Sequence, residues 1–226
     1  MVRVKICGLM TEEDVEAAVL AGADSLGFVT EYPVSVPWNI TRERARALAA
    51  SVPPFVTTTA VVGGAVEEMV SIALTVRPHF LQLHGDETVE EIQAVCKALA
   101  GTGIKAIKAL RIKAETGEAL FHVADPADAC RVLEQSGVSG IVLDSMTASK
   151  PAGTGLTLDW ESLRRISERL SLPLVLAGGL NPANVRAAIE IVKPFGVDVI
   201  SGIERKPGVK DPRLIREFVN AVKACR

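Results

Sequence analysis

The sequence predicts a single (β/α)8 barrel, or TIM barrel, from three observations. Eight short apolar runs alternate with helical patterns along the 226 residues. The runs are rich in β-branched residues and mostly do not alternate with polar ones, as expected for parallel strands buried on both faces. A helix pattern follows each run, and the chain is close to the roughly 250 residues typical of this barrel. We therefore expect one domain over residues 1–226.

The expected strands are spread over the whole chain. They are Val2–Ile6, Ser25–Val29, Phe55–Val61, Phe80–Leu83, Lys105–Leu110, Gly140–Leu143, Leu174–Leu176 and Val197–Ile200. An open, doubly wound sheet is the rival arrangement, and its nucleotide-binding versions carry G-x-G-x-x-G after the first strand. Here that position reads Cys7-Gly8-Leu9-Met10, which disfavours the open sheet.

The helices between these strands have recognisable starts. Thr11 precedes an acidic first turn, and the helix it begins should end near Gly22. Thr88 and Glu91 have the spacing of a capping box. Val66–Val76 has the apolar spacing of a further helix. The other expected N-caps are Asp125, Asn181 and Asp211, each followed by proline, together with Thr41 and Asp159.

Composition excludes several classes of function. The formal net charge is −2 and the basic residues are scattered, so we expect no nucleic-acid partner. No apolar run approaches the roughly 20 residues needed to span a bilayer, and a strand begins at once, so we expect no membrane contact and no signal peptide. The four cysteines are widely spaced, without a C-x-x-C pair. They predict free thiols in a cytoplasmic protein and no metal site.

The strand ends supply the candidate catalytic residues, because barrel enzymes work at the C-terminal ends of their strands. Cys7 ends the first strand and Asp144 ends the sixth. A thiolate can remove a proton from carbon, and a carboxylic acid can donate one to oxygen. The pair fits an acid–base isomerisation of a phosphorylated sugar. The alternatives are a packed cysteine and an aspartate that caps a loop.

Two further groups of residues are expected to bind the substrate. Gly178-Gly179 and Ser201-Gly202 follow the seventh and eighth strands, where glycine lets a phosphate dianion approach backbone N–H groups. They could instead be turn residues only. Gln82 and His84 alternate on the fourth strand, point to the same side, and are expected to contact substrate. Their alternative is a hydrogen-bonded place at the barrel rim.

These residues, in this order, resemble the phosphoribosylanthranilate isomerase family. The resemblance covers essentially the whole chain. The matching segments are Val4–Gly8, Ala21–Phe28, Leu81–Gly85, Gly153–Gly155 with Asp159-Trp160, Leu176–Val185, Gly196–Glu204 and Pro207–Asp211.

The resemblance implies an Amadori rearrangement in tryptophan biosynthesis, without metal or organic cofactor. N-(5-phosphoribosyl)anthranilate would become 1-(o-carboxyphenylamino)-1-deoxyribulose 5-phosphate. The family's general acid matches Asp144, which would protonate the furanose ring oxygen. Its general base matches Cys7, which would then remove the proton from C2 of the sugar. Gly155 is expected among the substrate-binding residues. The sequence does not fix the oligomeric state.

The chain departs from the family pattern after the second strand. The family usually has a basic pair there, whose arginine meets the anthranilate carboxylate, but Tyr32–Asn39 contains no arginine. Trp38 stands in this stretch and would stack on the aromatic ring, or else pack under the loop. Two rival functions remain. One is another phosphate-binding barrel isomerase acting on an aminoaldose phosphate. It would have an acidic residue at the position that Cys7 occupies here. The other is a non-catalytic sugar-phosphate-binding barrel, which would be expected to lack the acid–base pair.

Overall fold

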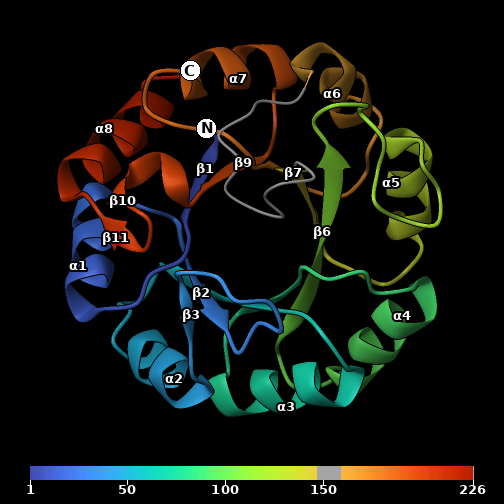
Figure 1. Cartoon of the computed structure of the whole chain (residues 1–226), viewed down its shortest axis with the longest axis horizontal. Coiled ribbons are helices and arrows are strands. Elements are labelled where there is room, and N and C mark those ends of the chain that lie inside the picture. Colours follow the sequence, from blue (N-terminus) through green and yellow to red (C-terminus); the bar gives the residue numbers. More distant parts are fainter. Residues whose placement is uncertain (147–158, 226) are drawn as a thin grey trace.

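The computed structural model describes residues 1–146 and 159–225, and it confirms the barrel (Figure 1). Each strand of the barrel pairs in parallel with its neighbours, and β1 pairs with both β9 and β2, which closes the sheet. The strands are β1 (Arg3–Ile6), β2 (Ser25–Thr30), β4 (Thr57–Val62), β5 (Phe80–Leu83), β6 (Lys105–Lys113), β7 (Ile141–Met146), β8 (Leu174–Leu176) and β9 (Gly196–Val199).

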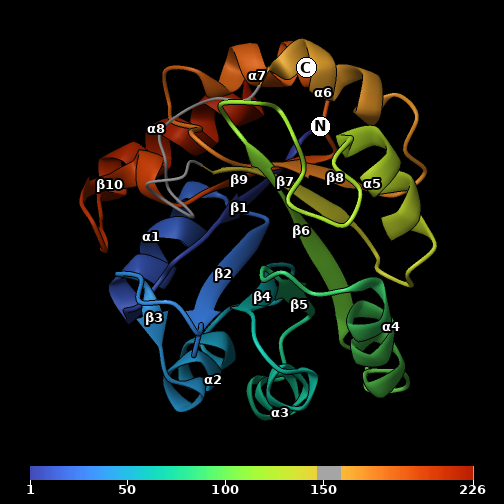
Figure 2. The same cartoon turned by 45° about the vertical axis from the view of Figure 1, so that its right-hand side comes forward.

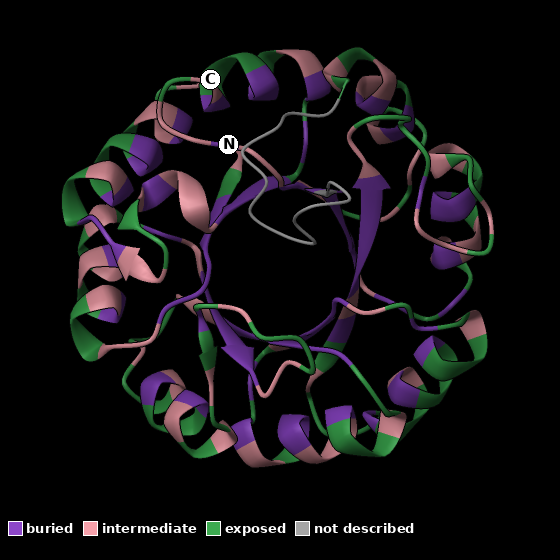
Figure 3. Ribbon diagram, in the orientation of Figure 1, coloured by how far each residue is buried: buried purple, intermediate pink, exposed green. Residues whose placement is uncertain are grey.

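The helices form a ring around these strands (Figure 1). They are α1 (Glu12–Ala21), α2 (Arg42–Ala50), α3 (Val66–Val76), α4 (Val89–Ala98), α5 (Pro126–Glu134), α6 (Trp160–Ser167), α7 (Val185–Val192) and α8 (Pro212–Lys223). Their buried residues face the strands, and their exposed residues lie on the outside of the ring (Figure 3). No helix in the described ranges is long and apolar enough to cross a membrane.

Most helices begin at the predicted caps. Thr11 and Thr88 form capping boxes, and α5 and α8 begin with proline after an aspartate cap. The prediction for Asn181 is wrong, because α7 begins at Val185 with Asn184 in the N-cap position. The Asn181 side chain instead accepts hydrogen bonds from the N–H groups of Ala183 and Asn184 at 2.9 and 3.2 Å. It closes a turn ahead of the helix, a role that uses the same oxygen as a cap.

Short extra elements follow the C-terminal ends of β2 and β9. β3 (Asn39–Ile40) extends the pairing of β2. The 3-10 turn η1 (Ser201–Ile203) leads into a hairpin of β10 (Glu204–Lys206) and β11 (Val209–Lys210). β6 and β7 both run beyond the predicted ends, and β6 is a long strand in the barrel wall (Figure 2).

Alternate positions on each strand face different surroundings. Leu110, Leu143 and Leu176 belong to the large cluster that the strands share with the helices. Their neighbours Ala109, Val142 and Ala177 form a separate small cluster, which we assign to the barrel interior. Small interior residues leave room at the C-terminal end of the barrel. The polar side chains that alternate with the helix-facing residues therefore meet there.

Candidate active site

Most of the predicted site residues meet in one cavity at the C-terminal ends of the strands. It has a volume of about 40 Å³. The predicted residues that line it are Cys7, Gln82, His84, Asp144, Gly178, Gly179 and Ser201. Gly202 follows the lining residue Ser201 in the chain, and Trp38 packs against the lining residue Cys7. Gly155 lies outside the described residues.

Cys7 is buried in the barrel with only 1% of its surface exposed. Burial raises the pKa of its thiol, and the Lys5 ammonium beneath it partly offsets that rise. A Cβ at Gly27 would lie 2.5 Å from Cys7 Sγ and 3.1 Å from Lys5 Cε, which places both side chains against the same strand. The thiol therefore lies within reach of a positive charge, which favours its thiolate form.

Lys5 is held by Asp198 of β9. Its Nζ lies 2.6 Å from Asp198 Oδ2, and the two side chains are 8% and 5% exposed. Burial lowers the pKa of Lys5, but Asp198 and the Cys7 thiol together raise it above its ordinary value. Lys5 is therefore a fixed cation inside the barrel. Sequence reasoning missed this pair, although two charges inside apolar strands were a signal.

Asp144 lies on β7 beside His84, the residue directly after β5. The closest atoms, His84 Nε2 and Asp144 Oδ2, are 3.3 Å apart, but they do not have the geometry of a hydrogen bond. Gln82 Nε2 lies 3.1 Å from His84 Nδ1. The Tyr32 hydroxyl donates to the His84 carbonyl at 2.9 Å, and the two rings meet edge to face. These contacts hold the imidazole beside the carboxylate.

Several buried polar atoms in this cavity have no hydrogen-bond partner among the described residues. They are Gln82 Oε1, His84 Nε2 and Asp198 Oδ1. Buried polar groups are normally paired, because an unpaired one costs about 1–3 kcal/mol. Three such atoms around one cavity point to a polar ligand that completes them.

The loops after β8 and β9 touch each other. Gly178 and Gly179 both have positive φ, at 83° and 66°. A Cβ at Gly202 would overlap the Leu180 carbonyl oxygen, so the turn η1 comes close to the loop after β8 only because residue 202 is glycine. The Asn184 amide also donates to the Gly179 carbonyl at 2.9 Å. Backbone of both loops is thereby brought to one edge of the cavity.

Trp38 connects the loop after β2 to the hairpin after β9. It is 6% exposed and packs with Cys7, Val29 and Val61. Its Nε1 donates to Glu204 Oε1 at 2.5 Å, and Lys210 Nζ lies 2.9 Å from the same oxygen. The tryptophan thus has packing partners and a hydrogen bond of its own. Glu204 and Lys210 had no predicted role.

Arg111 is a further residue at the mouth that sequence reasoning missed. It is paired with Asp144 in the register of β6 and β7, and it is 8% exposed. Its guanidinium pairs with Asp86 of the loop after β5. The predicted strand ended at Leu110, so Arg111 was placed in a loop. Its position two residues beyond the interior residue Ala109 was the available signal.

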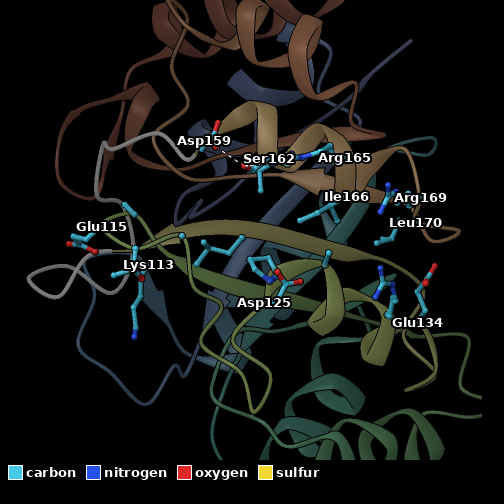
Figure 4. Close-up of a pocket in the computed structure, with 18 residues that line it drawn as sticks. Lys113, Glu115, Asp125, Glu134, Asp159, Ser162, Arg165, Ile166, Arg169 and Leu170 are labelled. Carbon is cyan, nitrogen blue, oxygen red and sulfur yellow. Dashed lines mark hydrogen bonds between the residues drawn. The ribbon is translucent and has the colours of Figure 1, made fainter.

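A larger hollow of about 740 Å³ lies outside the barrel, between α5 and α6 (Figure 4). Charges of both signs line it, including Glu134, Asp159 and Arg165. None of the site residues described above takes part in it. Across the described ranges, no group of three or more His, Cys, Asp or Glu residues could hold a metal ion.

Comparison with known proteins agrees with this site. The family model for N-(5′-phosphoribosyl)anthranilate isomerase matches residues 4–221. The chain belongs to the N-(5′-phosphoribosyl)anthranilate isomerase family. A relative of that name from Haloferax volcanii is 39% identical over 100% of this chain and 95% of its own length. Another, from Pseudomonas fluorescens, is 42% identical over 98% of both chains.

Solved structures of the family have the same fold. Phosphoribosyl anthranilate isomerase from Thermotoga maritima superposes with a TM-score of 0.83, at 37% identity over 99% of both chains. A second structure of the family, at 35% identity and a TM-score of 0.79, holds reduced 1-(o-carboxyphenylamino)-1-deoxyribulose 5-phosphate; the similarity covers 99% of both chains. A thiamine phosphate pyrophosphorylase from Pyrococcus furiosus is 16% identical with a TM-score of 0.65, and shares the fold alone.

Proposed function

We propose that this chain isomerises N-(5′-phosphoribosyl)anthranilate to 1-(o-carboxyphenylamino)-1-deoxyribulose 5-phosphate, a step of tryptophan biosynthesis. The observation that carries the proposal is the cavity at the barrel mouth. It is lined by a thiol, a carboxyl group and two glycine loops, in a chain that belongs to the isomerase family over its whole length. The four cysteines are free thiols, which fits a cytoplasmic enzyme.

Asp144 is the general acid of this proposal. It donates a proton to the furanose ring oxygen while the nitrogen lone pair forms the C1–N double bond, which breaks the C1–O bond and opens the ring. The position of Asp144 in the lining of the cavity supports this role, because its carboxyl group can contact a bound sugar there. After ring opening, Asp144 is a carboxylate and the Schiff base carries the positive charge.

Cys7 is the general base. Its thiolate removes the proton from C2, and the electron pair forms a C1–C2 double bond while the C1–N double bond becomes single. The resulting enolamine tautomerises to the ketone. Lys5 supports this role, since a cation beside the sulfur stabilises the thiolate that burial disfavours.

The phosphate lies against the loops after β8 and β9. Gly178, Gly179, Ser201 and Gly202 bring backbone close to the ligand, as loops at this place of the barrel usually do. Gln82 and His84 contribute unpaired polar atoms for the rest of the substrate. Trp38 is buried among Cys7, Val29 and Val61, so we expect it to stabilise the fold, and its contact with the aromatic ring stays a prediction.

A fluorescence assay for the loss of phosphoribosylanthranilate tests the proposal. The purified protein should consume this substrate, and Cys7→Ala and Asp144→Asn should each lower kcat by on the order of 100-fold or more. Asp144→Asn should still bind the product analogue, because it keeps the shape of the side chain. Absence of turnover in the wild-type protein would refute the function, and near-normal turnover in either variant would refute that residue's role.

The rival isomerase makes a different prediction. An aminoaldose isomerase with two aspartates would have an acid on the first strand, where this chain has Cys7. Turnover of an aminoaldose phosphate without an anthranilate ring would favour it. The retained thiol and carboxyl pair argues against a non-catalytic sugar-phosphate-binding barrel.

A further inference from the structure

We propose that Arg111 binds the carboxylate of the anthranilate ring. The inference deepens the proposed function and rests on it. It assigns a substrate contact to a strand residue in a chain whose loop after β2, residues 31–38, contains no arginine.

The order of strands places the aromatic end of the substrate near Arg111. Around the barrel the order is β1, β2, β4, β5, β6, β7, β8 and β9. The phosphate loops follow β8 and β9, so the opposite side of the mouth is formed by β4 and β5, with β6 beside them. Cys7 on β1 and Asp144 on β7 lie between these two sides. A substrate whose sugar reaches both catalytic residues therefore extends its ring toward β4, β5 and β6.

Arg111 reaches this part of the mouth from β6. It is the register partner of Asp144, and in a parallel pair such partners point to the same side of the sheet. The charges of Arg111 and Asp144 both act on the Tyr32 phenol, whose pKa is raised mainly by burial. Tyr32 packs edge to face on His84, with ring centroids 6.2 Å apart. The Tyr32 ring and the Arg111 guanidinium thus lie on the same side of the mouth as Asp144, the proposed general acid.

The current partner of Arg111 is easy to exchange. Asp86 has 82% of its side chain exposed, whereas the Arg111 side chain is 9% exposed. Water can solvate Asp86 when its partner leaves, so breaking an ion pair with so exposed a member costs little. The planar guanidinium can bind a carboxylate with two parallel hydrogen bonds. An incoming aryl carboxylate can therefore replace Asp86 at the buried end of the pair.

The other cations near the described part of the mouth are committed elsewhere. Lys5 is bound to Asp198 inside the barrel, and Lys210 is bound to Glu204. Lys108 donates to the carbonyl oxygens of Gly85 and Ala109 and pairs with Glu87. These pairs are buried on both sides, so removing a partner would leave an uncompensated charge.

Two more basic residues are also held in ion pairs. Arg42 of α2 is bound by both Glu31 and Glu68. Lys113 lies at the end of β6, is 42% exposed, and pairs with Glu118. Of the described cations, Arg111 is thus the one that combines a buried guanidinium with an exposed, replaceable partner at the mouth.

Two ligands distinguish a carboxylate-binding role of Arg111 from a purely structural role. The first is reduced 1-(o-carboxyphenylamino)-1-deoxyribulose 5-phosphate, and the second is the same compound without the ring carboxylate. Calorimetric titration of the wild-type protein should give a Kd lower by roughly 10- to 100-fold for the first, the usual scale of a charge-assisted contact. In Arg111→Gln this preference should fall to about two-fold or less, while the affinity for the second compound stays close to that of the wild type.

Matched variants serve as controls. Asp86→Asn removes the ion pair but keeps Arg111, so it should retain the preference, as should Lys113→Gln on the same strand. Arg111→Lys keeps the charge without the two-pronged fork and should retain part of the preference. It provides a second reading if Arg111→Gln does not give a wild-type melting curve.

The outcomes are distinct. A folded Arg111→Gln or Arg111→Lys protein that keeps the full preference would overturn the inference, as would an equal loss in Asp86→Asn. A wild-type protein that binds both compounds with equal affinity would also overturn it. Failure of the wild-type protein to bind either compound would instead refute the proposed function itself, and the inference with it.

Discussion

Removing Lys5 from the barrel interior should destabilise the protein strongly. Lys5→Met would leave the Asp198 carboxylate buried, with Oδ1 still unpaired and Oδ2 deprived of a partner now 2.6 Å away. With both side chains at 8% exposure or less, water cannot take over the lost interaction without opening the barrel. Breaking a buried pair by removing one partner costs about 3–5 kcal/mol.

The expected loss is large enough to measure in two ways. In urea at neutral pH, the free energy of unfolding of Lys5→Met should fall by about 3–5 kcal/mol with an unchanged m value. For a chain of this size each kcal/mol lowers Tm by about 2–4 °C, so Tm should fall by roughly 6–20 °C. Asp198→Leu should show a loss of the same order, because it leaves the Lys5 ammonium unpaired.

The double variant decides whether the pair acts as a unit. Lys5→Met with Asp198→Leu removes both charges, and such replacements are often close to neutral. It should be more stable than either single variant, with a coupling energy of about 2 kcal/mol or more. The argument from burial would be refuted if each single variant lowered the free energy of unfolding by less than about 1 kcal/mol. It would also be refuted if the loss in the double variant equalled the sum of the two single losses.

Three further predictions concern the mouth of the barrel. Because the thiolate is the proposed base and burial raises the pKa of Cys7 above its ordinary 9.0, kcat/KM should rise with pH through the alkaline range, and Cys7→Ala should abolish that rise. Gly202→Ala would overlap the Leu180 carbonyl oxygen, so KM and the inhibition constant of inorganic phosphate should increase several-fold; unchanged values would place the phosphate elsewhere. Trp38→Ala should lower stability by about 3–5 kcal/mol, whereas a raised KM with an unaltered Tm would make the indole a contact of the substrate ring instead.

The fold was accessible from the sequence because strands buried on both faces leave continuous apolar runs. Where those runs end, the prediction failed in a defined way. β6 and β7 continue to Lys113 and Met146, past the polar residues Arg111 and Asp144 that interrupt those runs. The hydrophobic pattern of a sequence indicates which side chains are buried. Backbone hydrogen bonding between two strands, in contrast, continues as long as the neighbouring strand does. Arg111 was therefore left outside the strand that positions it.

Part of the site could likewise be predicted from the sequence, and part could not. The meeting of Cys7 and Asp144 in one cavity could be predicted, because strand ends in a barrel share one face. The ion pair of Lys5 and Asp198 could not, since 193 residues separate the partners in the chain. Their contact depends on β1 pairing with β9, which is the step that closes the barrel. The charged residues inside apolar strands were a signal, but which of them pair with each other depends on closure and cannot be read locally from the sequence.

The same closure gives the substrate its direction. Each strand contributes interior side chains near its C-terminal end, so the order of strands fixes the order of chemical groups around the mouth. The proposed phosphate loops after β8 and β9, the proposed acid on β7 and the proposed base directly after β1 leave β4, β5 and β6 for the ring. A phosphate and a carboxylate are both anions, and each could occupy the other's place if only charge were read. The backbone N–H groups proposed at one end and the guanidinium of Arg111 proposed at the other differ in geometry, and this difference predicts a single orientation of the bound substrate.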